Sequence, residues 1–169
     1  YVKDANQQGA SLLMQHLIKQ GHKKIAGIFT NSSQQGMERA QGYLLEQSNH
    51  ALPFCDEYLL FVAEETDFIN NPHLNPAQLN DCTAFLCQND RIAYALLLEL
   101  RQRGYQVPKE YAIVSFDNTY LSESRILTLT SLTHKPHEIT EKAVQTLLSK
   151  IKGLPVTSQE VPWTLVEKA

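Results

Sequence analysis

The stretch TAFLCQNDRIAYALLLELRQRGYQVPKEYAIVSFDN, residues 83–118, decides the fold of this chain. Two short apolar runs flank a longer segment in which Ile92, Ala95, Leu96 and Leu100 recur at the spacing of one helix face. A strand, a helix and a second strand in this order form the βαβ signature of a parallel sheet. The stretch therefore predicts an α/β fold.

Each apolar run of this stretch ends in a pair of short polar residues. Asn89 and Asp90 follow the first run, and Asp117 and Asn118 follow the second. Open α/β proteins bind their ligands at the carboxyl ends of parallel strands, so both pairs are candidates for a binding site. Asp90 is typical of a helix N-cap, whereas the amide of Asn89 suits the hydroxyl groups of a ligand. The carboxylate of Asp117 can accept hydrogen bonds from neighbouring sugar hydroxyls, with an Asx turn as the alternative.

The rest of the chain continues the alternation of strands and helices. We therefore expect a parallel sheet with helices on both faces. The polar segment 67–81 reads as a loop with at most one helix, from Pro76. Helices are expected over Gln7–Gln20, after a cap at Ser33 and from Pro136, and strands at KKIAGIFT, EYLLFV, LTSLTH and VPWTLVEKA.

Two further residues are candidates for the same edge of the sheet. Arg39 lies near the start of the second helix, where a cation opposes the helix dipole, so it can pair with a ligand or a carboxylate. The alternative is a solvated arginine paired with Glu38 or Asp117. His134 ends the extended segment LTSLTH and can equally be an ordinary surface or hinge residue.

The composition narrows the class of protein. The 169 residues are 43% hydrophobic and 20% charged, as expected for a soluble globular chain of one domain or two small lobes. A net charge of −3 indicates no nucleic-acid-binding surface within this chain. No apolar run approaches the ~18 residues that span a membrane.

The residues give little support to catalysis or metal binding. Three cysteines, Cys55, Cys82 and Cys87, have no zinc-binding spacing, and a reducing cytosol is the simplest compartment for them. P-loop, GxSxG and GxGxxG motifs are absent. Cys87 as a nucleophile would need a matched histidine and acid, and none is evident. We therefore expect a protein that is not an enzyme and carries neither a metal nor a cofactor.

The chain contains, in this order, GASLLMQHLIKQGHKKIAGIF, GMERAQGY, the stretch 83–118 and LTSLTHKPHEITEKAVQTLL. These four segments, in this order, resemble the LacI/GalR family of bacterial regulators. The resemblance covers essentially the whole chain. Parts of it, IAGIFTNSSQQGMERAQGY and LTSLTHKPHEITEKA, are most similar to arabinose-responsive repressors of Gram-positive bacteria, which join a sensor module of this family to a GntR-type winged helix.

The resemblance implies a periplasmic-binding-protein-like module of type I, in which a parallel sheet flanked by helices forms each of two lobes. A sugar would bind in the cleft between the lobes. By this mapping the chain holds a complete C-terminal lobe and only part of the N-terminal lobe. Crossovers between lobes would lie near 21–24, 129–133 and 153–161. The parts would be a remnant of the N-terminal lobe with helix 7–20 (1–23), the C-terminal effector-binding lobe (24–128), a crossover and N-terminal-lobe helix (129–153), and a crossover with the last strand (154–169).

The resemblance also implies the binding residues. Arg39, Asn89 and Asp117 match family positions that contact sugar hydroxyls, and His134 matches a position in the cleft beside a crossover. Gln35, Gly36 and Glu38 would lie by the same edge in the arabinose repressors, and Glu64 and Glu65 would reach it by topology.

The implied function is effector sensing, with L-arabinose as the expected effector, by a homodimeric cytoplasmic repressor without a membrane partner. Operator DNA would be bound by a winged-helix or helix-turn-helix domain absent from this chain. An exported sugar-binding protein and a repressor for a purine or another sugar are alternatives within the binding class. An α/β enzyme is the alternative outside it.

Overall fold

The computed structural model describes residues 1–63, 81–122 and 129–168, and these form two sheets of unequal size. The larger sheet has the strand order β3-β2-β4-β5-β6-β8, and the smaller pairs β1 with β7. The strands are β1 (Val2–Asp4), β2 (Ile25–Phe29), β3 (Leu59–Phe61), β4 (Ala84–Cys87), β5 (Ala112–Phe116), β6 (Thr130–Thr133), β7 (Gln159–Val161) and β8 (Thr164–Val166). The helices are α1 (Asn6–Lys19), α2 (Gln34–Asn49), α4 (Asp90–Gln102) and α5 (Pro136–Ile151), with a short 3-10 helix at Asp56–Tyr58.

The larger sheet confirms the predicted α/β fold. Its first five strands in spatial order, from β3 to β6, run parallel. The last strand, β8, pairs with β6 in the antiparallel direction, which corrects the expectation of a wholly parallel sheet. Strand direction is set by the connection that precedes the strand, here a short one from β7, and an apolar pattern carries no information about it.

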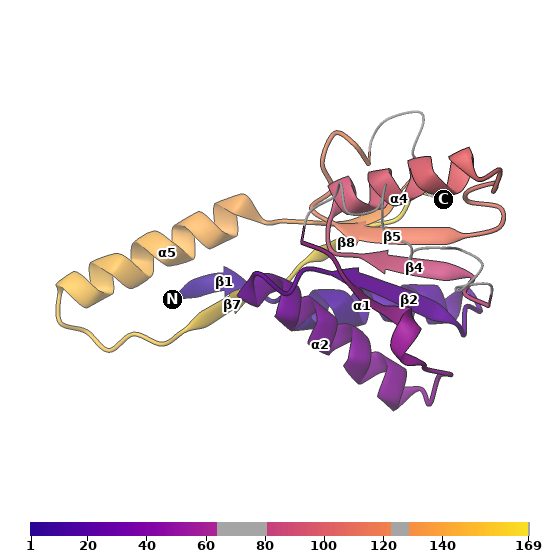
Figure 1. The fold of residues 1–169 in the computed structure, drawn as a ribbon. Helices are drawn as coiled ribbons and strands as arrows, with labels where there is room; N and C mark the ends of the chain where they lie inside the picture. Colours follow the sequence, from indigo (N-terminus) through magenta and orange to yellow (C-terminus); the bar gives the residue numbers. More distant parts are fainter. Residues whose placement is uncertain (64–80, 123–128, 169) are drawn as a thin grey trace.

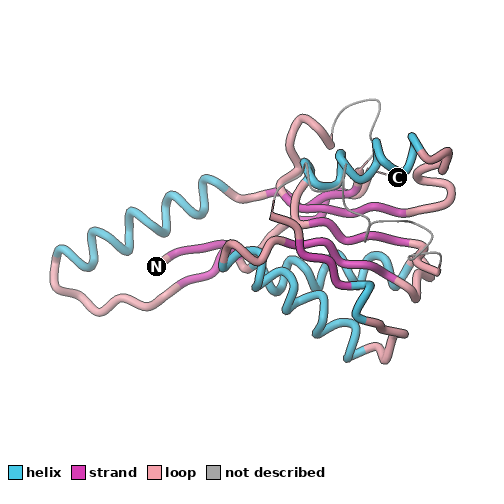
Figure 2. Tube along the Cα trace, in the orientation of Figure 1, coloured by secondary structure: helices cyan, strands magenta, loops and turns pink. Residues whose placement is uncertain are grey.

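Helices cover both faces of the larger sheet, as predicted (Figure 2). On one face, α1 and α2 pack in an apolar cluster that contains Leu13, Tyr43 and Phe116. On the other face, α4 buries Ile92 and Leu96 in a second cluster. Ser33 caps α2 as expected, since its side chain accepts a hydrogen bond from the backbone N–H of Gly36.

Helix α1 belongs to the larger sheet, contrary to the expected assignment of residues 1–23 to the N-terminal lobe. Its residues Leu13 and Met14 are fully buried in the same cluster as Phe29. The backbones of α1 and α2 approach closely, because a Cβ added at Gly42 would lie 2.2 Å from the carbonyl oxygen of Gln7. Helical periodicity predicts which face of a helix is buried but not against which sheet. The first crossing between units therefore precedes α1 and does not lie at 21–24.

We call β1, β7 and α5 the smaller unit, and the six-stranded sheet with α1, α2 and α4 the larger unit. The smaller unit extends to one side of the larger (Figure 1). Three connections join them: β1 to α1, β6 to α5 and β7 to β8. Helix α5 packs with β1 and β7, and its assignment to an N-terminal lobe stays a prediction. Among the described residues, no helix is both long and apolar enough to cross a membrane.

Candidate ligand-binding site

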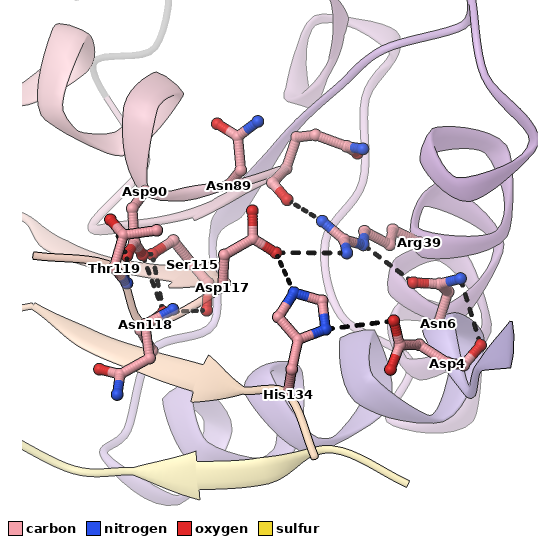
Figure 3. A network of polar contacts seen from close by, with 12 residues as sticks. Asp4, Asn6, Arg39, Asn89, Asp90, Ser115, Asp117, Asn118, Thr119 and His134 are labelled. Atoms are coloured by element: carbon pink, nitrogen blue, oxygen red, sulfur yellow. Dashed lines mark hydrogen bonds and ion pairs between the residues drawn. The ribbon is translucent and has the colours of Figure 1, made fainter. Parts of the chain in front are cut away.

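The predicted polar residues converge beside the three connections, at the carboxyl edge of the larger sheet (Figure 3). Arg39 comes from the second turn of α2, Asp117 follows β5 and His134 follows β6. A parallel sheet brings the ends of neighbouring strands to one edge, so residues distant in sequence meet there. The structure therefore brings together three of the six predicted site residues in one polar network.

Arg39 is the buried centre of this network, with only 1% of its surface exposed. Its Nε donates a hydrogen bond to Oδ1 of Asn6 at 3.1 Å, and its Nη1 donates to the carbonyl oxygen of Gln88. Its Nη2 lies 3.6 Å from Oδ1 of Asp117 and has no hydrogen-bond partner among the described residues. The guanidinium carbon lies 3.9 Å from the ring centre of Phe116. Arg39 thus lies beside a carboxylate, as expected. The alternative named the same partner, Asp117, but its expectation of a solvated arginine is wrong.

Burial lowers the pKa of Arg39 to about 10, against the opposing influence of Asp117 and Asp4. The guanidinium is therefore still charged at neutral pH. A buried cation with one unpartnered nitrogen is costly unless a nearby group satisfies it. This nitrogen is a donor available to a ligand oxygen beside Asp117.

His134 bridges two carboxylates. Its Nδ1 lies 3.2 Å from Oδ2 of Asp4 and its Nε2 lies 3.3 Å from Oδ1 of Asp117. Its ring centre lies 4.2 Å from that of Trp163. The hydrogen bond with Asp117 and the charges of both carboxylates raise the pKa of His134, while burial and Arg39 oppose the shift. His134 therefore favours the imidazolium form at this site.

Asp117 is held in an unusual backbone conformation. Its φ is 94° and that of Asn118 is 44°, both in the left-handed region. The loop after β5 is held in place by Asp90, whose Oδ2 accepts hydrogen bonds from the backbone N–H and the hydroxyl of Thr119 at 2.5 and 2.9 Å. The side chain of Asp117 remains 28% exposed, so it can meet a ligand.

The N-cap of α4 is Asn89 and not Asp90, the residue expected there. Oδ1 of Asn89 accepts a hydrogen bond from the backbone N–H of Ile92 at 2.9 Å. Asp90 is fully buried and accepts hydrogen bonds from the hydroxyls of Ser115 and Ser131 as well as from Thr119. Two adjacent residues of similar capping preference cannot be ranked from sequence alone.

Capping uses only the oxygen of the Asn89 amide. Its nitrogen has no hydrogen-bond partner among residues 1–63, 81–122 and 129–168, so the same side chain still offers donors to a ligand. Asn89 thus stays a candidate for ligand binding. It also caps α4, which its position in the sequence did not predict.

The remaining predicted residues differ in their placement. Glu38 joins the network indirectly, since it accepts hydrogen bonds from Lys3, Asn6 and Gln34. Burial would raise the pKa of Glu38, but these three hydrogen bonds together lower it below its ordinary value. Gln35 is exposed and makes no hydrogen bond to the network.

Two other expectations concern packing and the undescribed residues. A Cβ at Gly36 would lie 2.0 Å from the carbonyl oxygen of Thr30, so this glycine allows α2 to approach the end of β2. Glu64 and Glu65 lie outside the described residues.

Sequence reasoning missed Asp4, Asn6 and Trp163. They come from the two ends of the chain, and nothing in their local pattern marks them as partners of His134 and Arg39. Trp163 is 4% exposed, and its Nε1 has no hydrogen-bond partner among the described residues. Among the residues that the structure describes, no three histidine, cysteine or acidic residues are grouped to hold a metal ion.

A family model described as a periplasmic binding protein-like domain matches residues 14–169. The chain is 34% identical over 156 residues to an arabinose metabolism transcriptional repressor of Geobacillus stearothermophilus, covering 89% of this chain and 43% of the relative. It is 30% identical over 159 residues to the HTH-type transcriptional repressor PurR of Actinobacillus pleuropneumoniae serotype 3, covering 89% and 46%. The chain thus spans less than half the length of these two curated relatives.

Solved structures of transcriptional regulators share the fold of this chain. A CelR transcriptional regulator in complex with cellobiose superimposes with a TM-score of 0.88 at 23% identity, covering all of this chain and 54% of the other. A LacI transcriptional regulator from Bacillus cereus subsp. cytotoxis has a TM-score of 0.85 at 26% identity, covering 99% and 61%. The chain belongs to the family of periplasmic binding protein-like domains, and it fits the effector-binding domain of LacI-family regulators.

Proposed function

We propose that this chain is the effector-sensing region of a bacterial transcriptional repressor and that its effector is the sugar L-arabinose. The observation that carries the proposal is the buried pairing of Arg39 with Asp117 beside His134, at the edge where the larger unit meets the three connections. Relatives named as arabinose repressors support the choice of sugar.

The free polar atoms of this network suit neighbouring hydroxyl groups. Arg39 Nη2 and the amide nitrogen of Asn89 are donors without a partner in the described structure, and Asp117 is a partly exposed acceptor. A sugar hydroxyl donates one hydrogen bond and accepts others, so adjacent hydroxyls can satisfy donors and acceptor together. Arg39, Asn89, Asp117 and His134 would contact the sugar, and Glu38 would hold Lys3 and Asn6 in place behind them.

A purine effector is the second candidate, because several relatives are PurR repressors. A base needs an exposed aromatic face on which to stack. Among the described residues, Phe116 is fully buried against Arg39, and Trp163 is 4% exposed beside His134. Both rings are already occupied by side chains of the network, which favours a polyhydroxyl ligand.

The proposed mechanism is a change in the placement of the two units. An effector that binds one arrangement more tightly shifts the population toward it. In a homodimeric cytoplasmic repressor, this shift would change dimer geometry and the affinity for operator DNA, which a winged-helix or helix-turn-helix domain outside this chain would contact. An exported sugar-binding protein with the same site would lack that domain.

The test is isothermal titration of the full-length protein with L-arabinose, D-xylose, D-galactose, D-ribose and adenine. Saturable binding of L-arabinose alone would support both the repressor and its effector. Saturation by another sugar would contradict only the arabinose assignment. Saturation by adenine would favour the purine candidate, and binding of none would contradict the site.

A further inference from the structure

All three connections between the units contribute a residue to one cluster. Asp4 ends β1 before α1, His134 stands between β6 and α5, and Trp163 lies between β7 and β8. His134 contacts the other two directly, through its bond to Asp4 and its ring contact with Trp163. Any movement of the smaller unit relative to the larger would therefore change the contacts within this cluster.

The geometry of His134 favours its charged form. Both ring nitrogens lie within 3.3 Å of a carboxylate oxygen, one from β1 and one from the loop after β5. A neutral imidazole has one N–H and one lone pair, so one of its nitrogens would face a carboxylate without a proton. The imidazolium donates to Asp4 and Asp117 together.

The other charges around His134 are consistent with this form. Arg39 on α2 is the opposing cation, and it is itself directed at Asp117. On the segment that carries His134, Lys135 pairs with Glu138 at 3.8 Å. Two carboxylates therefore determine the net charge around the His134 ring, and one of them, Asp4, belongs to the smaller unit.

We propose that Asp4 is a positioning residue of the effector site: it holds His134 as an imidazolium that orients Asp117, so that effector affinity depends on a proton and on the placement of β1. This inference rests on the proposed function for the role of Asp117. Asp4 accepts from His134, and its proposed role is exerted through that histidine.

The arrangement couples three events. When β1 moves away, His134 loses one carboxylate and binds its proton less tightly. Loss of the proton leaves one bridging bond unmade and frees the Asp117 carboxylate to rotate. By linkage, an effector that needs the ordered carboxylate favours both the proton and the close placement of β1.

The first measurement is the titration of the His134 ring by NMR in the effector-free full-length protein. We expect the pKa of His134 to fall in Asp4→Asn, to be restored in Asp4→Glu and to stay unchanged in Glu160→Gln. Glu160 lies opposite Lys3 in the register of β1 and β7 and pairs with it, so its variant removes the same charge from the same unit without touching His134. An unchanged pKa in Asp4→Asn would overturn the proposal.

The second measurement is the affinity for L-arabinose from pH 5 to pH 9. Wild-type affinity should fall as the pH rises through the raised pKa of His134. In Asp4→Asn this fall should begin at lower pH, leaving binding about three- to tenfold weaker at neutral pH, the cost of ordering one freed side chain. Thermal unfolding of each variant shows that it is folded.

The two readouts separate the possible failures. An equal loss of affinity at every pH in Asp4→Asn would mean that Asp4 acts only through the fold, and would overturn the positioning role. Absence of L-arabinose binding to the wild type would contradict the proposed effector, and the NMR titration alone would then decide whether Asp4 holds the imidazolium.

Discussion

The larger unit buries an apolar cluster on each face of its sheet, whereas α5 of the smaller unit has no buried residue. The exposed residues of α5 include Leu147 and Ile151, at 58% and 72%. The smaller unit is held instead by the pairing of β1 with β7 and by polar contacts of Lys3 and Asp4. The larger unit thus has the packing of a rigid platform, whereas within residues 1–169 the smaller unit buries little apolar surface.

The largest expected effect tests this difference in packing. In the chain of residues 1–169, Leu13→Ala removes a fully buried side chain from the cluster under α1. We expect the free energy of unfolding to fall by about 2–5 kcal/mol, whereas Leu147→Ala on α5 should change it by less than about 0.5 kcal/mol. Urea denaturation followed by circular dichroism measures both. Equal losses would show that α5 is packed as tightly as α1.

The second prediction concerns the binding edge of the larger unit. Asp117→Ala leaves a sugar hydroxyl without its acceptor and removes the carboxylate 3.6 Å from Arg39 Nη2, at a cost of about 1–3 kcal/mol, or roughly 5- to 150-fold in affinity for L-arabinose. Glu141→Ala on the exposed face of α5 is the control and should bind as the wild type does. Titration calorimetry gives both values, and unchanged affinity in Asp117→Ala would remove this residue from the site.

Arg39→Ala should differ from Asp117→Ala in a second respect. The guanidinium also donates to Asn6 and Gln88 from a fully buried position, so its loss should lower stability as well as affinity. The pair of variants therefore separates a residue that binds from one that both binds and anchors α2.

A smaller effect separates the two tasks of Asn89. Asn89→Ala removes the cap of α4 and should cost about 0.5–2 kcal/mol of stability. Asn89→Asp keeps an oxygen for the cap but replaces the donor nitrogen by an acceptor, so stability should be retained while L-arabinose affinity falls. Thermal unfolding and calorimetry on the same two proteins measure this. Full affinity in Asn89→Asp would confine Asn89 to the cap.

The sequence was a good guide to the strands and helices of the larger unit because each is an apolar run or an amphipathic repeat of ordinary length. The stretch 83–118 predicted β4, α4 and β5 and placed their polar ends at one edge. The hydrophobic pattern of a strand or helix does not determine the direction in which it runs or the elements it packs against, however. The antiparallel β8 and the packing of α1 on the larger sheet depend on connections and on distant contacts such as that of Gly42 with Gln7.

The site was predictable in its parts and not in its assembly. Arg39 opposes the dipole of its helix and Asp117 follows a buried strand, so the residues alone suggested both. Only the resemblance to a family favoured His134. Asp4 meets His134 across 130 positions of sequence, and no local signal encodes that contact. Asp90, expected to be a cap, anchors the loop of Asp117 instead, because capping depends on which residue first adopts helical angles.

The smallest expected effect compares the two ends of the large sheet through their histidines. His134 has a raised pKa, so its protonation stabilises the fold; this contribution is complete below its ordinary pKa and is lost as pH rises through the raised value. His22, which precedes β2, has a pKa lowered by burial and by His16, so it destabilises the fold as pH falls through its ordinary value. The two residues therefore predict opposite slopes of the free energy of unfolding against pH.

Urea denaturation from pH 5 to pH 9 on the wild type, His134→Gln and His22→Gln measures these slopes. The stability advantage of the wild type over His134→Gln should shrink as pH rises, whereas its advantage over His22→Gln should grow. A difference for His134→Gln that does not vary with pH would mean that the histidine is not charged between Asp4 and Asp117. Because the bridge spans both units and the His22 contact with Thr83 lies within one, only the first slope should also become shallower in Asp4→Asn.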